Sequence, residues 1–140
     1  MNGGWVDFVQ QACRHSGRHG LATHSPQVPL VIVSGGQSGV DRAALDAALA
    51  SGVEVAGWCP AGRWAEDGPI DARYPLRETA AADPAVRTRR NVAESDALLV
   101  LAPSPPSGGT ALAIAEAARL GRPVLVAGPG DDPAEAVAWL

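Results

Sequence analysis

The chain has 140 residues, of which 46% are hydrophobic and 19% are charged, and its formal net charge is −4. This length predicts one domain with a sizeable core, and the composition excludes a disordered chain. The negative charge argues against a nucleic-acid-binding surface, and no apolar run reaches the ~20 residues that cross a bilayer. The first residues lack the basic flank and apolar segment of a secretory signal, so we expect a cytoplasmic protein.

The alternation of apolar and polar segments predicts the elements of the fold. Residues 1–27 are expected to form a short amphipathic helix (3–15) and a polar linker, and residues 28–140 a single ligand-binding domain. In that domain, strands over 28–34, 53–58, 96–102 and 123–127 alternate with helices over 40–51, 84–94, 109–120 and 133–140, and a long loop spans 59–71. The strands are almost continuously apolar, which is typical of a parallel sheet covered on both faces. The predicted fold is a three-layer α/β/α sandwich with a mainly parallel sheet.

Capping signals support the helix boundaries. Asp83 and Asp132 each precede a proline, which is the pattern of an N-cap followed by proline at the first helical position. Gly52 and Gly121 are placed as the glycines that end helices.

A glycine-rich turn joins the first strand to the first helix. Its glycines let the backbone approach a ligand closely, and the helix that follows presents unpaired N–H groups and the positive end of its dipole. The sequence therefore predicts that a phosphate or similar anion binds here; the alternative is a tight connection without a ligand, in which Gln37 caps the turn. The predicted donors are the backbone of Gly35, Gly36, Gln37, Ser38 and Gly39 and the hydroxyl of Ser38.

A second turn of this kind, Ser107-Gly108-Gly109-Thr110, opens the helix after the strand 96–102. In a parallel sheet, the loops that lead from strands to helices lie at the carboxyl edge. We therefore expect both turns to face one ligand.

Charged and aromatic side chains near these turns have two interpretations each. Asp41 either stabilises the helix start or recognises a ligand hydroxyl or ring nitrogen, and Arg42 either complements the anion or is solvated. Arg87 and Asn91 are four residues apart and share a helix face, so we assign both to the pocket, with a surface ion pair to Asp83 or Glu94 as the alternative for Arg87. Trp58 and Trp64 could stack on a flat heterocycle or belong to a core or subunit contact.

The two cysteines, Cys13 and Cys59, match no disulfide framework or zinc pattern and are interpreted as free thiols. We therefore expect no structural metal.

Several short motifs follow one another within residues 30–127: Ser34-Gly-Gly-Gln-Ser-Gly-Val-Asp-Arg-Ala-Ala-Leu45, Gly57-Trp-Cys-Pro-Ala-Gly-Arg63, Ala65-Glu-Asp-Gly68, Tyr74-Pro-Leu76, Arg87-Thr88, Asn91-Val92 and Ser107-Gly-Gly-Thr110. In this order they resemble the molybdenum cofactor carrier proteins, which belong to the wider group of Rossmann-like nucleotide-sensing and lysine-decarboxylase-like (LOG) proteins. The resemblance implies a homo-oligomeric Rossmann-like protein that binds molybdopterin, the phosphate-bearing form of the molybdenum cofactor, or a nucleotide-like ligand, without transforming it. It also implies that a molybdoenzyme receives the ligand, and that Arg63 is one of the ligand-binding residues.

The enzymes of that superfamily cleave nucleoside monophosphates with a Pro-Gly-Gly-x-Gly-Thr-x-x-Glu motif. In this chain, Ala113 stands at the position of the glutamate, and Glu116 is one turn further along the helix. That displacement of ~4 to 5 Å disfavours hydrolysis by the same mechanism. The alternatives to a carrier are a nucleoside-monophosphate N-glycosidase that uses Glu116 or Glu66, and a scaffold that has lost its ligand.

Overall fold

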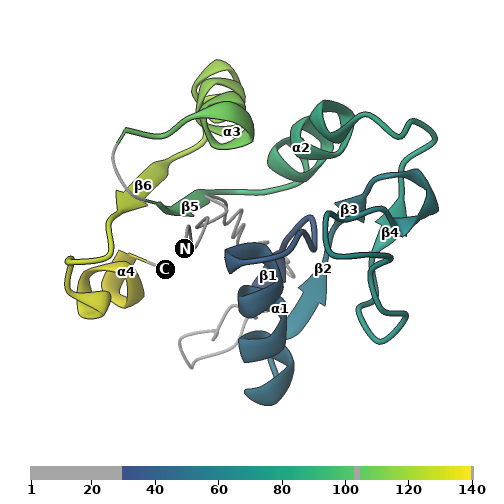
Figure 1. Cartoon of the computed structure of the whole chain (residues 1–140). Coiled ribbons are helices and arrows are strands. Elements are labelled where there is room, and N and C mark those ends of the chain that lie inside the picture. The colour runs from purple at the N-terminus through teal and green to yellow at the C-terminus, as the bar shows by residue number, and fades with distance from the viewer. Residues whose placement is uncertain (1–29, 103–104, 140) are drawn as a thin grey trace, which may run out of the picture.

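The computed structural model describes residues 30–102 and 105–139. The expected N-terminal helix and linker lie outside the described residues. Strands and helices alternate as predicted outside residues 54–78, where three short strands follow one another and the last, at 77–78, was not predicted. Figure 1 shows α2 and α3 on one side of the strands and α1 and α4 on the other. The elements in chain order are β1 (Val31–Val33), α1 (Val40–Ala50), β2 (Glu54–Ala56), β3 (Trp58–Cys59), η1 (Ala61–Arg63), β4 (Arg77–Glu78), α2 (Pro84–Ala93), β5 (Leu98–Leu101), α3 (Gly108–Arg119), β6 (Val124–Ala127) and α4 (Pro133–Trp139).

The strands form three parallel pairs: β1 with β2, β3 with β4, and β5 with β6. Ile32 lies opposite Val55 in the first pair, and Leu99 lies opposite Leu125 in the third. Helices cross over between the members of the first and third pairs, as parallel neighbours require. The predicted α/β fold with parallel strands is therefore confirmed.

Gly57 interrupts the strand that we predicted over residues 53–58. Ala56 still accepts a hydrogen bond from the Ser34 N–H (3.0 Å), whereas the Gly57 carbonyl accepts one from Arg77 N–H (2.9 Å). The chain thus changes its partner from β1 to β4 at this residue. Its φ of 142° and the close approach of the Ser34 main chain leave no room for a Cβ atom, so only glycine can make the exchange.

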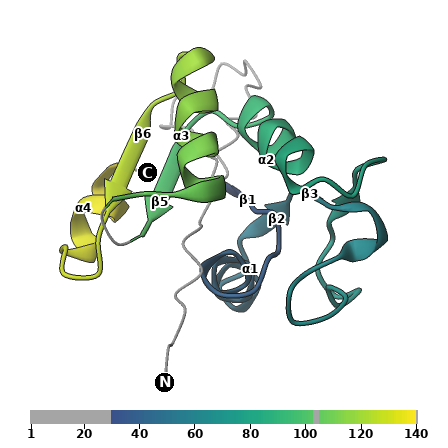
Figure 2. The ribbon, with the colours of Figure 1, turned by 45° about the horizontal axis from the view of Figure 1, so that its top comes forward.

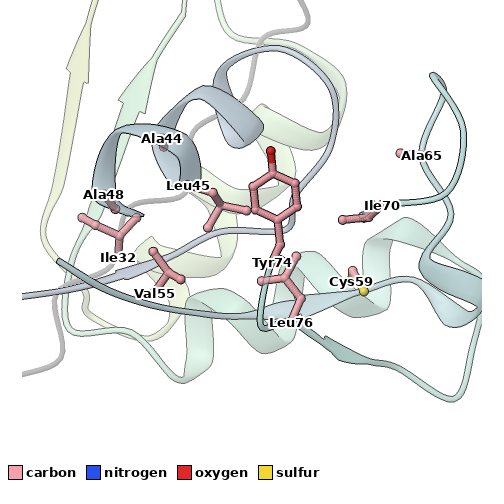
Figure 3. Close-up of a cluster of buried hydrophobic side chains, with 10 residues drawn as sticks. All are labelled: Ile32, Ala44, Leu45, Ala48, Val55, Cys59, Ala65, Ile70, Tyr74 and Leu76. Atoms are coloured by element: carbon pink, nitrogen blue, oxygen red, sulfur yellow. The ribbon is translucent and has the colours of Figure 1, made fainter. Parts of the chain in front are cut away.

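The described residues form three hydrophobic clusters, of which the smallest contains only Val31 and Val33, and the two larger ones stabilise the domain. The first lies between β1, β2, α1 and the segment 59–76, with Ile32, Leu45, Val55 and Tyr74 among its members (Figure 3). The second lies between β5, α2 and α3 and consists of Val92, Leu98, Val100, Ala102, Ala113 and Ala117.

The described part of the chain contains no helix that is long and apolar enough to cross a membrane.

Candidate anion-binding site

The first glycine-rich turn runs from the end of β1 at Val33 to the start of α1 at Val40. Gly36 and Gly39 have φ values of 70° and 89°, a region that favours glycine. Gly39 is the N-cap of α1, and no side chain among the described residues caps the helix there. Arg42 N–H donates to the Gln37 carbonyl (3.1 Å) and Ala43 N–H donates to the Gly39 carbonyl (3.0 Å), so an anion would meet the turn ahead of these two groups.

The preceding N–H groups of this turn donate to the protein itself. The Gly36 N–H donates to the Ser34 hydroxyl (3.2 Å), and the Gln37 N–H donates to the Asp41 carboxylate (3.4 Å). The Ser34 hydroxyl in turn donates to the Asp41 carbonyl (3.0 Å). These contacts fix the turn, and an anion at the helix start would meet the residues that follow, Ser38 and Gly39.

Arg87 packs against the inner side of the same turn. It lies on the buried face of α2 together with Asn91, as their spacing predicts, and is only 5% exposed. A Cβ atom on Gly35 would collide with the guanidinium and would lie 2.7 Å from Arg87 Cδ. Arg87 Nη1 lies 3.5 Å from an Asp41 carboxylate oxygen. Burial lowers the pKa of Arg87, and the Asp41 carboxylate opposes that shift.

The Asn91 side chain holds the main chain of Trp58 at the start of β3. Its carbonyl oxygen accepts a hydrogen bond from Trp58 N–H (2.8 Å), and its amide donates to the Trp58 carbonyl (3.0 Å). The sequence indicated that Asn91 shares a face with Arg87, but it did not indicate this partner.

Arg42 joins the turn to the loop that follows η1. Its Nε and Nη2 donate to the Gly36 carbonyl (3.2 and 2.9 Å), and its Nη1 and Nη2 contact the two oxygens of Asp67 (2.5 and 3.2 Å). The hydrogen bond from Arg42 lowers the pKa of Asp67. Gln37 makes a second connection, since its amide nitrogen donates to the Trp64 carbonyl (3.0 Å). Sequence reasoning did not find the Arg42–Asp67 pair, although Asp67 lies in one of the recognised motifs.

Arg63 organises the loop itself by donating to four backbone carbonyls. These belong to Ile70 (2.8 Å), Asp71 (2.6 Å), Tyr74 (2.9 Å) and Leu76 (3.3 Å). In addition, Arg63 adopts φ 54°, which is uncommon for a residue with a side chain. The family resemblance implied that Arg63 binds the ligand. In the structure, main-chain oxygens already surround its guanidinium.

The second glycine-rich turn precedes α3. Gly108, the first residue of the helix, has φ 55°. Ser107 is the N-cap, but its side chain makes no capping hydrogen bond to any described residue. A Cβ atom on Gly109 would meet no heavy atom of the described chain within 4 Å. The backbone at this helix start is therefore open to approach.

The other two helices cap themselves. The Asp83 carboxylate accepts a hydrogen bond from Ala85 N–H at the start of α2 (2.9 Å), and Asp132 accepts one from Ala134 N–H at the start of α4 (2.9 Å). Self-capping thus distinguishes α2 and α4 from the two helices that follow glycine-rich turns.

The elements next to the two glycine-rich turns contact a common hydrophobic cluster. Val40, the first residue of α1, and Leu101, the last residue of β5, pack against the same hydrophobic cluster. Both residues thus border the first hydrophobic cluster, and Figure 2 shows β5 and β6 to the left of β1, β2 and α1. Among the described residues no strand pairing joins β1 and β2 to β5 and β6, so the placement of both turns at one carboxyl edge stays a prediction.

In the nucleoside-monophosphate-cleaving enzymes of the superfamily, a glutamate stands at the position of Ala113. In this chain that position lies in the hydrophobic core. Ala113 is fully buried in the second hydrophobic cluster. Glu116 accepts two hydrogen bonds from Arg119 (3.1 and 2.5 Å), which lower the pKa of its carboxyl group. Glu116 is therefore ionised near neutral pH and has no proton to donate.

No group of three or more His, Cys, Asp and Glu side chains in the described ranges is placed to hold a metal ion. Cys59 is fully buried, and burial raises the pKa of its thiol.

Comparison with known proteins identifies the family. Residues 32–140 match the model of the circularly permutated YpsA SLOG family. The chain belongs to this family. This SLOG chain is also similar to the crystal structure of a putative molybdenum carrier protein from Syntrophus aciditrophicus, with 38% sequence identity and a TM-score of 0.72 over 78% of this chain and 69% of that one. No curated protein matches the chain. The family and the solved structure confirm the resemblance and the Rossmann-like fold.

Proposed function

We propose that this SLOG protein is a carrier that binds a phosphate-bearing heterocycle, namely molybdopterin or a nucleotide-like molecule. The observation that carries the proposal is the contrast between its helix starts: α2 and α4 are capped by aspartates, whereas α1 and α3 follow glycine-rich turns without a side-chain cap from the described residues. The similarity to a protein named for carrying molybdenum supports the choice of ligand.

Binding needs only groups that the fold already holds in place. The N–H groups at the start of α1 and α3 would donate to phosphate oxygens, and each helix dipole adds about 0.3 to 1 kcal/mol at an accessible site. Buried Arg87, behind Gly35, contributes positive charge that Asp41 partly offsets. An anion is therefore attracted without a specific side chain reaching into the solvent.

Two residues of α3, Ala113 and Glu116, argue against cleavage of an N-glycosidic bond. As the sugar develops positive charge in that reaction, acid or electrostatic assistance contributes ~10² to 10⁴-fold in rate. Ala113 provides no carboxylate, and the Glu116 carboxylate is engaged by Arg119. We expect no release of base from AMP or GMP above background. Robust release that is lost in a Glu116→Gln variant would establish an enzyme instead.

The binding proposal is tested with Gly109→Val. The valine side chain meets open space in the described structure, so it should cover the helix start without disturbing the core. Gly36 is unsuitable, because its φ of 70° and the proximity of Leu76 Cδ1 (2.6 Å) would perturb the fold. Gly130→Val, in the loop after β6, is the matched control, since a Cβ there also meets no described atom within 4 Å.

Calorimetry with GMP and neopterin phosphate should show binding that Gly109→Val weakens at least tenfold and Gly130→Val does not. Equal affinity in all three proteins would contradict the assignment of the second turn. Mass spectrometry of small molecules retained through gentle purification would then identify the heterocycle.

We further propose that the protein acts in the cytoplasm as a homo-oligomer and delivers its cargo to a molybdoenzyme. Val126 and Val137 are 45% and 71% exposed, and a second copy would cover such apolar surface.

A further inference from the structure

We propose that Trp64 is a specificity-determining residue, whose indole stacks on the planar heterocycle of a ligand held by its phosphate at the start of α1. This inference rests on the proposed function and names the group that selects a heterocycle over a simple phosphate.

The main chain of Trp64 is fixed beside the glycine-rich turn. Its carbonyl accepts the hydrogen bond from the side chain of Gln37, which belongs to that turn (3.0 Å). On one side, Arg63 is anchored to four backbone carbonyls, and on the other, Ala65 is 3% exposed and belongs to the first hydrophobic cluster. The backbone at residue 64 is thus held from three directions.

A second connection keeps the loop against the turn. Arg42 contacts both carboxylate oxygens of Asp67 and the Gly36 carbonyl at the same time. This connection uses charged groups in a two-pronged arrangement, which gives it directional specificity. The loop around residue 64 and the turn therefore form one surface before any ligand arrives.

The indole of Trp64 is nevertheless 50% exposed, and it is the most exposed aromatic side chain of the described residues. Tyr74 is buried in the core. Trp58 is already occupied, because its ring lies under Arg90 (4.3 Å) and Arg77 (5.7 Å) and its Nε1 donates to Glu94 (3.0 Å). Of these two tryptophans, Trp64 is the more exposed, and no arginine of the described residues is placed over its ring.

An open aromatic ring on a fixed backbone suits a flat, π-rich ligand. Stacking needs a ring face and little ordering of the side chain, and it tolerates purines and pterins alike. The proximity of residue 64 to the helix start means that one molecule carrying both a phosphate and a heterocycle can contact both groups.

The test compares ligands that share a phosphate but differ in the heterocycle. Calorimetry would measure GMP against ribose 5-phosphate, and neopterin phosphate against glycerol 3-phosphate, in the wild-type protein and in Trp64→Leu and Trp64→Phe. Replacing a stacking aromatic weakens binding of a base by about 5- to 150-fold. We expect that loss for the heterocyclic ligands in Trp64→Leu, little change for the base-free phosphates, and recovery of most of the affinity in Trp64→Phe.

The outcomes separate this inference from the function on which it rests. If wild-type protein binds the heterocyclic ligands and Trp64→Leu binds them equally well, the stacking role is wrong and the carrier proposal stands. A wild-type protein that binds heterocyclic and base-free phosphates equally also overturns the stacking role. Binding of none of the four ligands overturns both proposals.

Discussion

Replacement of Gly35 by alanine tests the packing of Arg87 behind the first glycine-rich turn. The added Cβ atom would lie 2.7 Å from Arg87 Cδ and 2.9 Å from Cζ, closer than real Cβ atoms approach other carbons. The guanidinium must therefore move, although it is only 5% exposed and its partner Asp41 is fully buried. Separating the partners of a buried ion pair costs about 3 to 5 kcal/mol. Since this pair is long at 3.5 Å, we expect a loss near the lower limit, about 3 kcal/mol.

Urea denaturation followed by circular dichroism measures this loss. With an m value of about 2 kcal/mol per molar, the midpoint should fall by about 1.5 M. Gly109→Ala is the matched control: its Cβ meets open space among the described atoms, so its stability should equal or slightly exceed that of wild type. The double variant Gly35→Ala with Arg87→Met should be more stable than the sum of the single effects predicts. Wild-type stability of Gly35→Ala would refute the packing argument.

Three further predictions concern other parts of the molecule. Arg63→Lys should lower the free energy of unfolding by at least about 2 kcal/mol, because an ammonium group cannot reach four carbonyls at once. The variant should also expose residues 64–76 to cleavage by thermolysin, and an unchanged digestion pattern would contradict this prediction. In a Cys13→Ser background, the buried Cys59 thiol should react with Ellman's reagent only after unfolding. Burial raises its pKa, so the unfolded chain loses the thiol proton first, and stability should fall as pH rises above about 8.5, an effect absent in Cys59→Ala. Light scattering should give a molecular mass that is at least twice the 14.3 kDa of one chain, and a monomeric mass would argue against the proposed oligomer.

The sequence predicted the helices well because their signals are local. The Asp-Pro pairs at residues 83–84 and 132–133 mark the starts of α2 and α4, and the glycine-rich turns mark those of α1 and α3. The same locality explains the failure at residues 53–58. The break at Gly57 depends on the Ser34 main chain, more than twenty residues away, and on the partner strand β4, whose pairing is not visible in the pattern of side chains.

The candidate site divides in a similar way. Spacing alone indicated that Arg87 and Asn91 share a face of α2, and both are buried there. Which atoms they contact could not be predicted, because Asp41 and Trp58 come from other elements. For Arg63 the sequence offers only a charge, and nothing local reveals that main-chain oxygens surround it.

The way in which Arg63 holds the loop has a consequence for which residues of this segment can change. Its four acceptors are carbonyl groups, which every amino acid possesses. Exposed side chains that follow Arg63, such as those of Trp64 and Glu66, can therefore be exchanged without removing any of the four contacts that Arg63 makes. New side chains can be placed on an unchanged backbone as long as Arg63 and the Arg42–Asp67 pair are kept. A library of variants at the exposed positions of this segment, built with Arg63, Arg42 and Asp67 fixed, is a practical way to look for new binding preferences.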